Sequence, residues 1–308
     1  MNPQIISIVT PSYNQGQFIE ETLQSVLTQE GEFYLDYIVV DGGSTDRSFE
    51  IIGKYETLLK ENCSTMEKDN LTFFVNPRRD FRWHRCLGIS YRWLSEKDNG
   101  QVHALNKGFN LAKGQIYAFL NSDDSYYPQT LNTICHASWG NAAFIYGQGM
   151  WISAQGREVL QYPTYPPSVY NLYYQCTLCQ PAVFFRAEAF RRQGEFSMEF
   201  PDTFDYEYWL RAAFAREKFL YVKALLAKSR MHEENKSMGQ RKDISHQVRE
   251  LKETYYDRSP RRLSKLKLFL TQFAVQRKTV KQVNRLFSAL GSDTRYHFWK
   301  KLRTFKDL

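Results

Sequence analysis

Two adjacent aspartates, Asp123 and Asp124, directly follow the apolar run AFL at residues 118–120. Because like charges repel, a pair of carboxylates at the end of a buried strand needs a compensating partner. Two explanations are open: the pair caps the segment that follows Pro128, or it binds a hard divalent cation such as Mg²⁺ or Mn²⁺, which prefers oxygen ligands. The two aspartates by themselves favour neither explanation.

Further carboxylates in the chain could act as acids or bases. Asp205 and Glu207 lie two residues apart in the segment FDYEYWLRAAF, so on a helix their side chains would point to different sides. Either carboxylate could serve as a general base, a role that is typically worth roughly 10²–10⁴-fold in rate. The structural alternative is that Asp205 caps the start of its helix.

The five cysteines of the chain do not form a strong metal-binding pattern. Cys176 and Cys179 make a C-x-x-C pair, but no second pair lies at the spacing of a zinc site, which favours packed, reduced thiols. No signal-peptide pattern precedes the first apolar run, and no window approaches the roughly 20 apolar residues of a membrane span. The sequence therefore predicts an intracellular protein without a transmembrane segment.

The apolar pattern predicts the elements that would position these residues. In the first 125 residues, short β-branched runs alternate with helix-like stretches, as is typical of a parallel α/β sheet. The runs IISIVT and YIVV each end in a polar loop, LTFFV is a further predicted strand, and the strand QIYAFLN leads to Asp123. Ligands of such sheets bind beyond the carboxyl ends of the strands, so we expect Asp41, Asp98 and Asp123 to converge there.

Three other regions differ from this pattern. Between residues 60 and 93 the apolar period is lost, and we predict an insertion beside the site. Residues 144–167 predict short antiparallel strands with Gly and Pro between them, and residues 204–215 predict a helix.

The net charge of +8 is unevenly distributed along the chain. Residues 240–308 hold 18 Lys and Arg against 6 Asp and Glu, a net charge of +12, so residues 1–239 carry −4. The tail predicts basic helices with an apolar stripe, which could lie on an anionic membrane surface or pack on the rest of the chain. No nucleic-acid-binding module accompanies the charge, so nucleic acid is not an expected partner.

Five segments, in order along the chain, resemble the family-2 glycosyltransferases, which have the GT-A type nucleotide-sugar fold. They are SIVTPSYNQGQFIEETLQSVLTQ, YIVVDGGSTDRS, SEKDNGQVHALNKGFNLAKGQIYAFLNSDD, CQPAVFFR and FDYEYWLRAAF. The resemblance implies an α/β fold of GT-A type, with a Rossmann-like, mostly parallel sheet flanked by helices and a C-terminal basic helical extension. The GT-A domain would cover residues 1–239, with a nucleotide-binding half at 1–125 and an acceptor-binding half at 126–239, and the extension would cover 240–308.

The resemblance also implies roles for individual residues. The nucleotide-binding set is Thr10, Pro11, Tyr13, Asp41, Asp98, Lys107 and Ser122. The metal-binding set is Asp123, Asp124 and His232, which would hold Mn²⁺ or Mg²⁺ together with the donor diphosphate. Asp205 would be the catalytic base, with Glu207 as the fallback and Asp202 as a weaker candidate. Asn121 departs from the usual Asp-x-Asp motif, at the position that could contact the ribose.

Some of these residues also have ordinary structural explanations. Asp41 could cap the turn at Gly42, Lys107 could be an exposed helix lysine, and His232 could be a surface histidine. Both explanations stay open at each of the three positions.

The implied activity is transfer of a sugar, with inversion, from a nucleotide-diphosphate donor such as a UDP-sugar to an acceptor hydroxyl. The acceptor would be a saccharide or a lipid-linked saccharide in cell-surface polysaccharide or glycolipid biosynthesis, and the enzyme would be cytoplasmic or peripheral on the cytoplasmic face of the membrane. One alternative is a metal-dependent nucleotidyltransferase, which usually has a Gly-rich, basic phosphate loop, unlike TPSYNQGQ. The other is a catalytically inactive carbohydrate-binding protein, against which Asp123, Asp124 and Asp205 argue.

Overall fold

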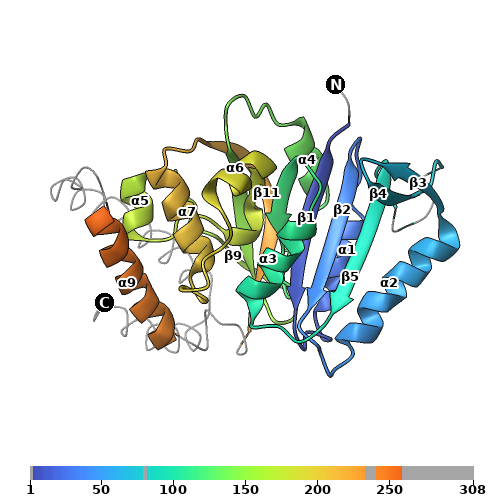
Figure 1. Cartoon of the computed structure of the whole chain (residues 1–308), viewed down its shortest axis with the longest axis horizontal. Helices are drawn as coiled ribbons and strands as arrows, with labels where there is room; N and C mark the ends of the chain where they lie inside the picture. The colour runs from blue at the N-terminus through green and yellow to red at the C-terminus, as the bar shows by residue number, and fades with distance from the viewer. Residues whose placement is uncertain (1–2, 79–81, 83, 233–240, 259–308) are drawn as a thin grey trace. The chain divides into compact units, whose positions relative to one another are not determined.

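The computed structural model of the chain describes residues 3–78, 82, 84–232 and 241–258. Within these residues, eleven strands form one mixed sheet and helices pack on both of its faces (Figure 1). The strands are β1 (Ile5–Ser12), β2 (Tyr34–Asp41), β3 (Ser64–Lys68), β4 (Leu71–Val75), β5 (Gly88–Ser95), β6 (Ile116–Phe119), β7 (Ser125–Tyr126), β8 (Phe144–Ser153), β9 (Glu158–Gln161), β10 (Val183–Arg186) and β11 (Phe219–Met231). The helices are α1 (Ile19–Leu27), α2 (Ser48–Asn62), α3 (Gln101–Leu111), α4 (Thr130–His136), α5 (Val169–Tyr174), the 3₁₀ turn η1 (Gln180–Ala182), α6 (Ala187–Gln193), α7 (Phe204–Phe214) and α9 (Arg241–Arg258).

The four strands at the centre of the sheet run parallel, in the order β5, β2, β1, β6. β1 pairs with β2 up to Ser12 opposite Asp41, and β2 pairs with β5 up to Asp41 opposite Ser95. Because these strands are parallel, their carboxyl ends lie at the same edge of the sheet. The predicted α/β architecture with a parallel centre is confirmed, and Ser12, Asp41 and Ser95 mark the edge where a ligand is expected.

β1, β2 and β6 are buried along almost their whole length, which explains why their sequences are mainly apolar. All eight residues of β1 are buried. Helices α1 and α2 pack on the face that carries Ile8, while α3, α6 and α7 pack on the face that carries Val9. Gly108 allows α3 to approach the sheet closely, because a Cβ at this position would lie 2.3 Å from Val9 Cγ1.

Beyond β6 the sheet continues with strands of mixed direction. β10 is antiparallel to both β6 and β8, β11 is parallel to β8, and β7 is antiparallel to β11. β8 and β9 form the hairpin that the sequence predicts within residues 144–167. Since β7 begins at Ser125, its pairing with β11 holds the turn at Asp123 and Asp124 against the end of β11.

The prediction of an insertion between residues 60 and 93 is wrong. Residues 64–75 form the β3–β4 hairpin at one edge of the sheet, and residues 88–95 form β5, which pairs along its whole length with β2. The apolar period is lost because β5 is buried over its first four residues only, and Arg92 follows them in a half-buried position. Arg92 pairs with the buried Asp36, Nη2 to Oδ1 at 2.5 Å. This segment therefore contributes β3, β4 and most of β5 to the sheet.

The first of two compact units, Met1–Pro260, includes α9, which packs on α7 (Figure 1). The Tyr255 ring lies 5.3 Å from the Phe214 ring, and Gln247 Nε2 donates to Asp202 Oδ2 at 2.8 Å. The sequence predicts an extension from residue 240, whereas this first helix belongs to the same packed unit as the sheet. The rest of the predicted extension, from Arg261, lies outside the described residues. Among the helices that are described, none combines the length and apolar character needed to cross a membrane.

Candidate active site

The loop after β1 begins with an accessible side chain at the carboxyl edge of the sheet. Tyr13 is 61% exposed, whereas Thr10 and Pro11 are buried. Thr10 Oγ1 lies 3.0 Å from the Tyr37 hydroxyl, so its hydrogen bond is made inside the protein. Of the three residues predicted to bind nucleotide here, Tyr13 is the one that offers its side chain to a ligand.

Asp41 ends β2 and is completely buried. Its Oδ2 accepts hydrogen bonds from the Ser44 amide (2.9 Å) and the Ser95 hydroxyl (2.6 Å), and its Oδ1 accepts one from the Ser44 hydroxyl (2.5 Å). These bonds fasten the turn after β2 to the end of β5. The structure thus gives Asp41 the turn-capping contacts that are the alternative to base binding.

Asp98 lies next to the same turn. Gly42 has no side chain, and a Cβ placed there would come within 3.0 Å of Asp98 Oδ2. Asp98 Oδ1 accepts a hydrogen bond from the Gly100 amide at 2.8 Å, and the residue is half-buried. The structure therefore brings Asp98 to the end of β2 beside Asp41, with Asp98 as the more accessible carboxylate.

The remaining predicted nucleotide ligands differ in exposure. Lys107 Nζ on α3 lies 2.7 Å from Glu96 Oε1, and the lysine side chain is 27% exposed. A phosphate at Lys107 would therefore share this cation with Glu96. Ser122, in the loop after β6, is buried.

Asp123 and His232 are 109 residues apart in the sequence and meet beyond the ends of β6 and β11. Asp123 Oδ2 lies 3.0 Å from His232 Nε2, and the two side chains are 15% and 7% exposed. The His232 ring also packs on Phe18, with 4.7 Å between the ring centroids. A carboxylate oxygen and an imidazole nitrogen suit a divalent cation such as Mn²⁺. The structure thus brings together two of the three predicted metal ligands.

Asp124 makes different contacts from its neighbour. It is 3% exposed, and its Oδ1 accepts a hydrogen bond from the Arg230 amide at 2.9 Å. Burial and, next, the adjacent Asp123 carboxylate hold the pKa of Asp124 well above its usual range. In the part of the chain that the structure describes, no three His, Cys, Asp or Glu side chains are grouped to hold a metal ion. A cation at Asp123 and His232 would therefore need further oxygen ligands, as a diphosphate and water supply.

Asn121 is the middle member of a chain of amide side chains. Its Oδ1 accepts a hydrogen bond from Gln101 Nε2 (2.7 Å), and its Nδ2 donates to Gln180 Oε1 (3.3 Å). Gln180 Nε2 donates in turn to the Phe119 carbonyl at 2.9 Å. A carboxylate only accepts hydrogen bonds, so an aspartate at this position could not bond Gln180. Asn121, the residue that departs from the Asp-x-Asp motif, thus links α3, the loop after β6 and η1.

Asp205 lies in the first turn of α7. Burial raises its pKa to about 6 from an ordinary value of 3.8, although the Tyr206 amide donates to its Oδ1 at 2.8 Å. No Lys or Arg within the described ranges is paired with this carboxylate. A buried carboxylate without a cation is suited to accept a proton near neutral pH.

Cys179 connects the two acidic parts of the site. Burial raises the pKa of its thiol, and the carboxylates of Asp124 and Asp205 both add to the rise, so both lie within electrostatic reach of this sulfur. Cys176 and Cys179 are free thiols, as predicted. Asp124 in the turn after β6 and Asp205 in α7 are therefore both near Cys179.

Glu207 is held in the contact between α7 and α9. Its Oε2 lies 2.9 Å from Arg211 Nη2, and its Oε1 accepts a hydrogen bond from the Tyr255 hydroxyl at 2.6 Å. Both carboxylate oxygens are thus engaged, and the side chain is buried. The two predicted candidates for the base are separated, with Asp205 near the cysteines and Glu207 in a helix–helix contact.

Some residues at the site are not predicted from the sequence. Arg230 precedes His232 by two residues, the spacing that puts two side chains on the same face of a strand, and this spacing is the signal that could have found it. Gln101 and Gln180 lie far from Asn121 in the sequence, so no local pattern marks the amide chain.

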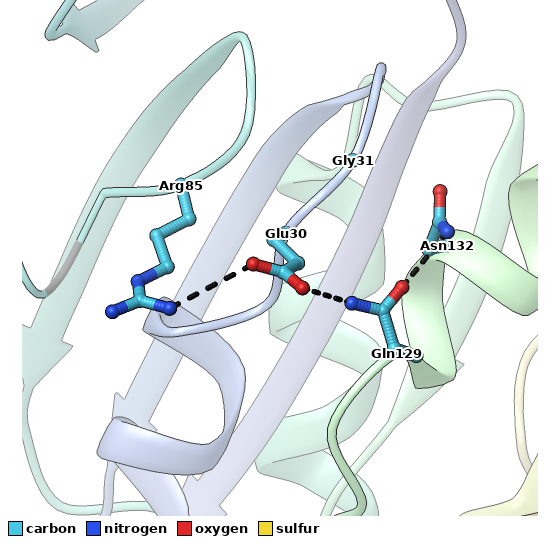
Figure 2. A pocket seen from close by; sticks show the side chains of 5 residues that line it. All are labelled: Glu30, Gly31, Arg85, Gln129 and Asn132. Atoms are coloured by element: carbon cyan, nitrogen blue, oxygen red, sulfur yellow. Dashed lines mark hydrogen bonds and ion pairs between the residues drawn. The ribbon is translucent and has the colours of Figure 1, made fainter. Parts of the chain in front are cut away.

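An open cavity of about 370 Å³ lies at the opposite edge of the sheet (Figure 2). Its lining residues are Glu30, Gly31, Arg85, Gln129 and Asn132. Figure 2 shows the Glu30 carboxylate between Arg85 and Gln129, so these polar groups pair with one another. Glu30 and Arg85 precede β2 and β5, whereas Asp41 and Ser95 end those strands. The cavity is therefore separate from the candidate active site.

Comparison with known proteins gives a family match over most of the sheet. The profile of the family described as "Glycosyl transferase family 2" matches residues 7–201. An uncharacterized glycosyltransferase from Rickettsia felis is 26% identical over 251 residues, which cover 76% of this chain and 35% of the relative. This chain thus spans about a third of the length of that relative.

Two solved structures share the fold. Staphylococcus aureus TarS, residues 1–349 in complex with UDP-GlcNAc, has a TM-score of 0.58 at 17% identity, covering 87% of this chain and 70% of that chain. The mannosyltransferase PcManGT from Pyrobaculum calidifontis, in complex with GDP-Man and Mn²⁺, has a TM-score of 0.57 at 13% identity, covering 98% and 80%. Likeness at these identities shows the fold alone, and it confirms the predicted GT-A type fold. These matches do not favour the nucleotidyltransferase alternative.

Proposed function

The chain belongs to glycosyl transferase family 2, and we propose that it transfers a sugar, with inversion, from a UDP-sugar to a hydroxyl of a saccharide or lipid-linked saccharide. One observation carries the proposal: Asp123 faces His232 at the turn after β6, a pair suited to a diphosphate-bound cation, while Asp205 in the first turn of α7 has no Lys or Arg partner among the described residues and is suited to accept a proton. The family match and the UDP-GlcNAc bound to TarS support this choice of donor.

The nucleotide would lie along the carboxyl ends of β1, β2 and β5. Tyr13 offers an exposed ring on which a base can stack, and Asp98 offers a half-buried carboxylate that can accept the N–H of a uracil. Asp41 is completely buried and already accepts three hydrogen bonds from Ser44 and Ser95, so it would hold the loop in place instead of contacting the base.

Asp123 and His232 would hold the cation, Mn²⁺ or Mg²⁺, and PcManGT with its bound Mn²⁺ supports this assignment. When bound, such a cation neutralises negative charge that builds up on the leaving diphosphate. Asp123 has 15% of its side chain exposed and His232 has 7%, so both donor atoms belong to a nearly dry site where electrostatic interactions are strong.

Asp205 would act as the general base. In its ionised form it accepts the proton of the acceptor hydroxyl while that oxygen bonds to the anomeric carbon and the bond from this carbon to the diphosphate oxygen breaks. Attack opposite the leaving group inverts the configuration and needs no covalent intermediate. A pKa of about 6 keeps most of the Asp205 carboxylate ionised at neutral pH while leaving it basic enough to accept a proton.

The purified chain should be incubated with a panel of UDP- and GDP-sugars and Mn²⁺ or Mg²⁺, and nucleoside diphosphate release and donor binding should be measured. We expect metal-dependent binding and slow hydrolysis of a UDP-sugar. Asp123→Asn should abolish the metal-dependent part of donor binding, because it removes one of two protein ligands. Asp69→Asn is a control, since Asp69 lies in the β3–β4 turn with a side chain that is 56% exposed.

Release of pyrophosphate instead of nucleoside diphosphate would replace the proposal by nucleotidyl transfer. Unchanged, metal-dependent donor binding by Asp123→Asn would contradict the assignment of the cation site. Donor binding without any turnover, across acceptors, would favour a binding protein.

A further inference from the structure

Arg230 is a buried arginine two residues before His232. Its side chain is 2% exposed, and it lies near the end of β11, beside the turn that carries Asp123 and Asp124. A buried guanidinium is costly unless its donors are satisfied, so the partners of this side chain indicate what it does.

Two hydrogen bonds of Arg230 hold the turn after β6. Its backbone amide donates to Asp124 Oδ1 at 2.9 Å, and its Nε donates to the Asp123 carbonyl at 2.9 Å. From the other side, Thr22 Oγ1 on α1 donates to the Asp124 carbonyl at 2.7 Å. The turn is thus fixed between β11 and α1.

The far end of the guanidinium binds two other segments. Nη2 lies 2.5 Å from Glu21 Oε2 on α1, and Nη1 donates to the Ala154 carbonyl in the β8–β9 turn at 3.0 Å. The planar group also stacks on the Phe18 ring, with its carbon 5.0 Å from the ring centroid. Because a guanidinium presents five donors in a fixed geometry, one side chain can hold all these segments in register.

Phe18 links Arg230 to the second cation ligand. The same ring that the guanidinium stacks on lies 4.7 Å from the His232 ring. Arg230 therefore contacts the main chain of Asp123 directly and the packing surface of His232 through Phe18.

We propose that Arg230 is a positioning residue that keeps the Asp123 carboxylate facing His232 and so sets the affinity of the site for a divalent cation with its diphosphate. The inference rests on the proposed function, since it concerns the same cation site. Partners that orient metal ligands typically change metal affinity by roughly 10–100-fold when they are removed.

The test compares Arg230→Gln and Arg230→Lys with the wild-type chain. Mn²⁺ affinity is measured in the presence of UDP from the electron paramagnetic resonance signal of free Mn²⁺, at a temperature where circular dichroism shows each variant folded. We expect roughly 10–100-fold weaker Mn²⁺ binding for Arg230→Gln. Arg230→Lys should lie between, because lysine keeps the charge but cannot bond all the segments at once. At saturating Mn²⁺ the turnover number of Arg230→Gln should be closer to the wild-type value than its Mn²⁺ affinity is.

Arg186 provides a matched control. Its Nε donates to the Ala142 carbonyl at 2.9 Å, and its guanidinium stacks on the Trp139 ring at 5.0 Å, so it combines the same kinds of contact away from the site. Arg186→Gln should lower the melting temperature and leave Mn²⁺ affinity unchanged.

Two results would overturn the inference, and only one of them also contradicts the proposed function. If wild type binds Mn²⁺ through Asp123 and Arg230→Gln binds it equally well, the inference fails and the proposed function stands. If wild type with UDP binds no Mn²⁺, both fail.

Discussion

Asp36 is a completely buried carboxylate and Asp205 a half-buried one, and their surroundings differ. Asp36 lies inside β2, where its Oδ1 pairs with Arg92 Nη2 at 2.5 Å and its Oδ2 accepts hydrogen bonds from the Ser7 hydroxyl (2.7 Å) and the Lys113 amide (3.0 Å). Asp205 Oδ1 accepts a hydrogen bond from the Tyr206 amide, and no Lys or Arg of the described residues pairs with this carboxylate.

The difference separates a carboxylate that holds the fold from one that is available for chemistry. The partners of Asp36 connect β1, β2, β5 and the loop after α3, so its charge is balanced and its oxygens are used. Asp205 is half-buried without such balance, and desolvation raises its pKa to about 6. We interpret this missing partner as the mark of the base, and each of the following changes tests that interpretation.

Asp205→Asn should have the largest effect. It removes the proton acceptor while keeping the shape of the side chain, so we expect turnover to fall by roughly 10²–10⁴-fold with donor affinity within about twofold of wild type. Steady-state transfer assays and calorimetric titration with the UDP-sugar measure the two quantities.

Glu207→Gln is the paired control for that experiment. It should lower stability by weakening the Arg211 and Tyr255 contacts while turnover stays within a few-fold of wild type. If Glu207→Gln loses turnover and Asp205→Asn keeps it, the two roles must be exchanged.

Asp36→Asn should lower stability and leave turnover nearly unchanged, the opposite of what we expect for Asp205→Asn. An amide in place of the carboxylate removes the charge that balances Arg92 and puts a donor against donors, and we expect a loss of about 2–4 kcal/mol in the free energy of unfolding. This range allows for Arg92 being 31% exposed. Urea denaturation measures the loss, and transfer assays at low temperature should show turnover within about twofold of wild type. Loss of turnover in a folded Asp36→Asn would remove the contrast with Asp205.

The sequence predicts the frame of the fold better than it predicts which carboxylates are paired. Three of the four central parallel strands, β1, β2 and β6, are predicted because burial on both faces favours apolar runs. β5 is missed because its second half is only half-buried, so Arg92 there lies outside the pattern. The partner of that arginine, Asp36, is 56 residues away, and no local pattern reveals the pair.

In the candidate site too, the sequence predicts where the residues lie better than it predicts which of them are paired. The acidic strand ends could be predicted because parallel strands share an edge, and the meeting of Asp123 with His232 agrees with the resemblance. The saturation of Asp41 by Ser44 and Ser95 and the engagement of Glu207 by Tyr255 depend on tertiary contacts that the sequence does not show.

The raised pKa of Asp205 should also make the stability of the protein depend on pH, which is a smaller effect. The folded-state pKa of Asp205 is raised from 3.8 to about 6, so folding favours the protonated form; this contribution is complete below about pH 3.8 and is lost as pH rises to about 6. Asp205→Asn cannot ionise and should be more stable than wild type by about 1–3 kcal/mol at pH 7.5, with the difference vanishing toward pH 4. Urea denaturation across this range measures it. A constant difference at all pH values would mean that Asp205 is not the titrating group.

The turnover of the wild-type chain should follow the same titration. Since the ionised carboxylate is the base, turnover should level off above a pH of about 6 and fall about tenfold per pH unit well below it. At pH 5 the loss is about tenfold, or about 1.4 kcal/mol. The profile should be measured at saturating metal and donor, and a fall centred near pH 4 would show that the base has an ordinary carboxyl pKa.

Asn121→Asp should have the smallest effect, because Asn121 lies in the site and yet both its amide oxygen and its amide nitrogen have a protein partner. Aspartate keeps the bond from Gln101 but places an oxygen against Gln180 Oε1, and Gln180 cannot turn its amide without losing the Phe119 carbonyl. We expect a loss of about 0.5–1.5 kcal/mol in unfolding free energy and a less than tenfold fall in turnover, even though the change restores the common motif. Combining Asn121→Asp with Gln180→Leu in a double-mutant cycle isolates the repulsion, and the penalty should shrink in that background. Higher Mn²⁺ affinity or turnover in Asn121→Asp would instead assign this position to the cation or donor, and its amide chain would no longer belong with the structural contacts that Asp36 represents.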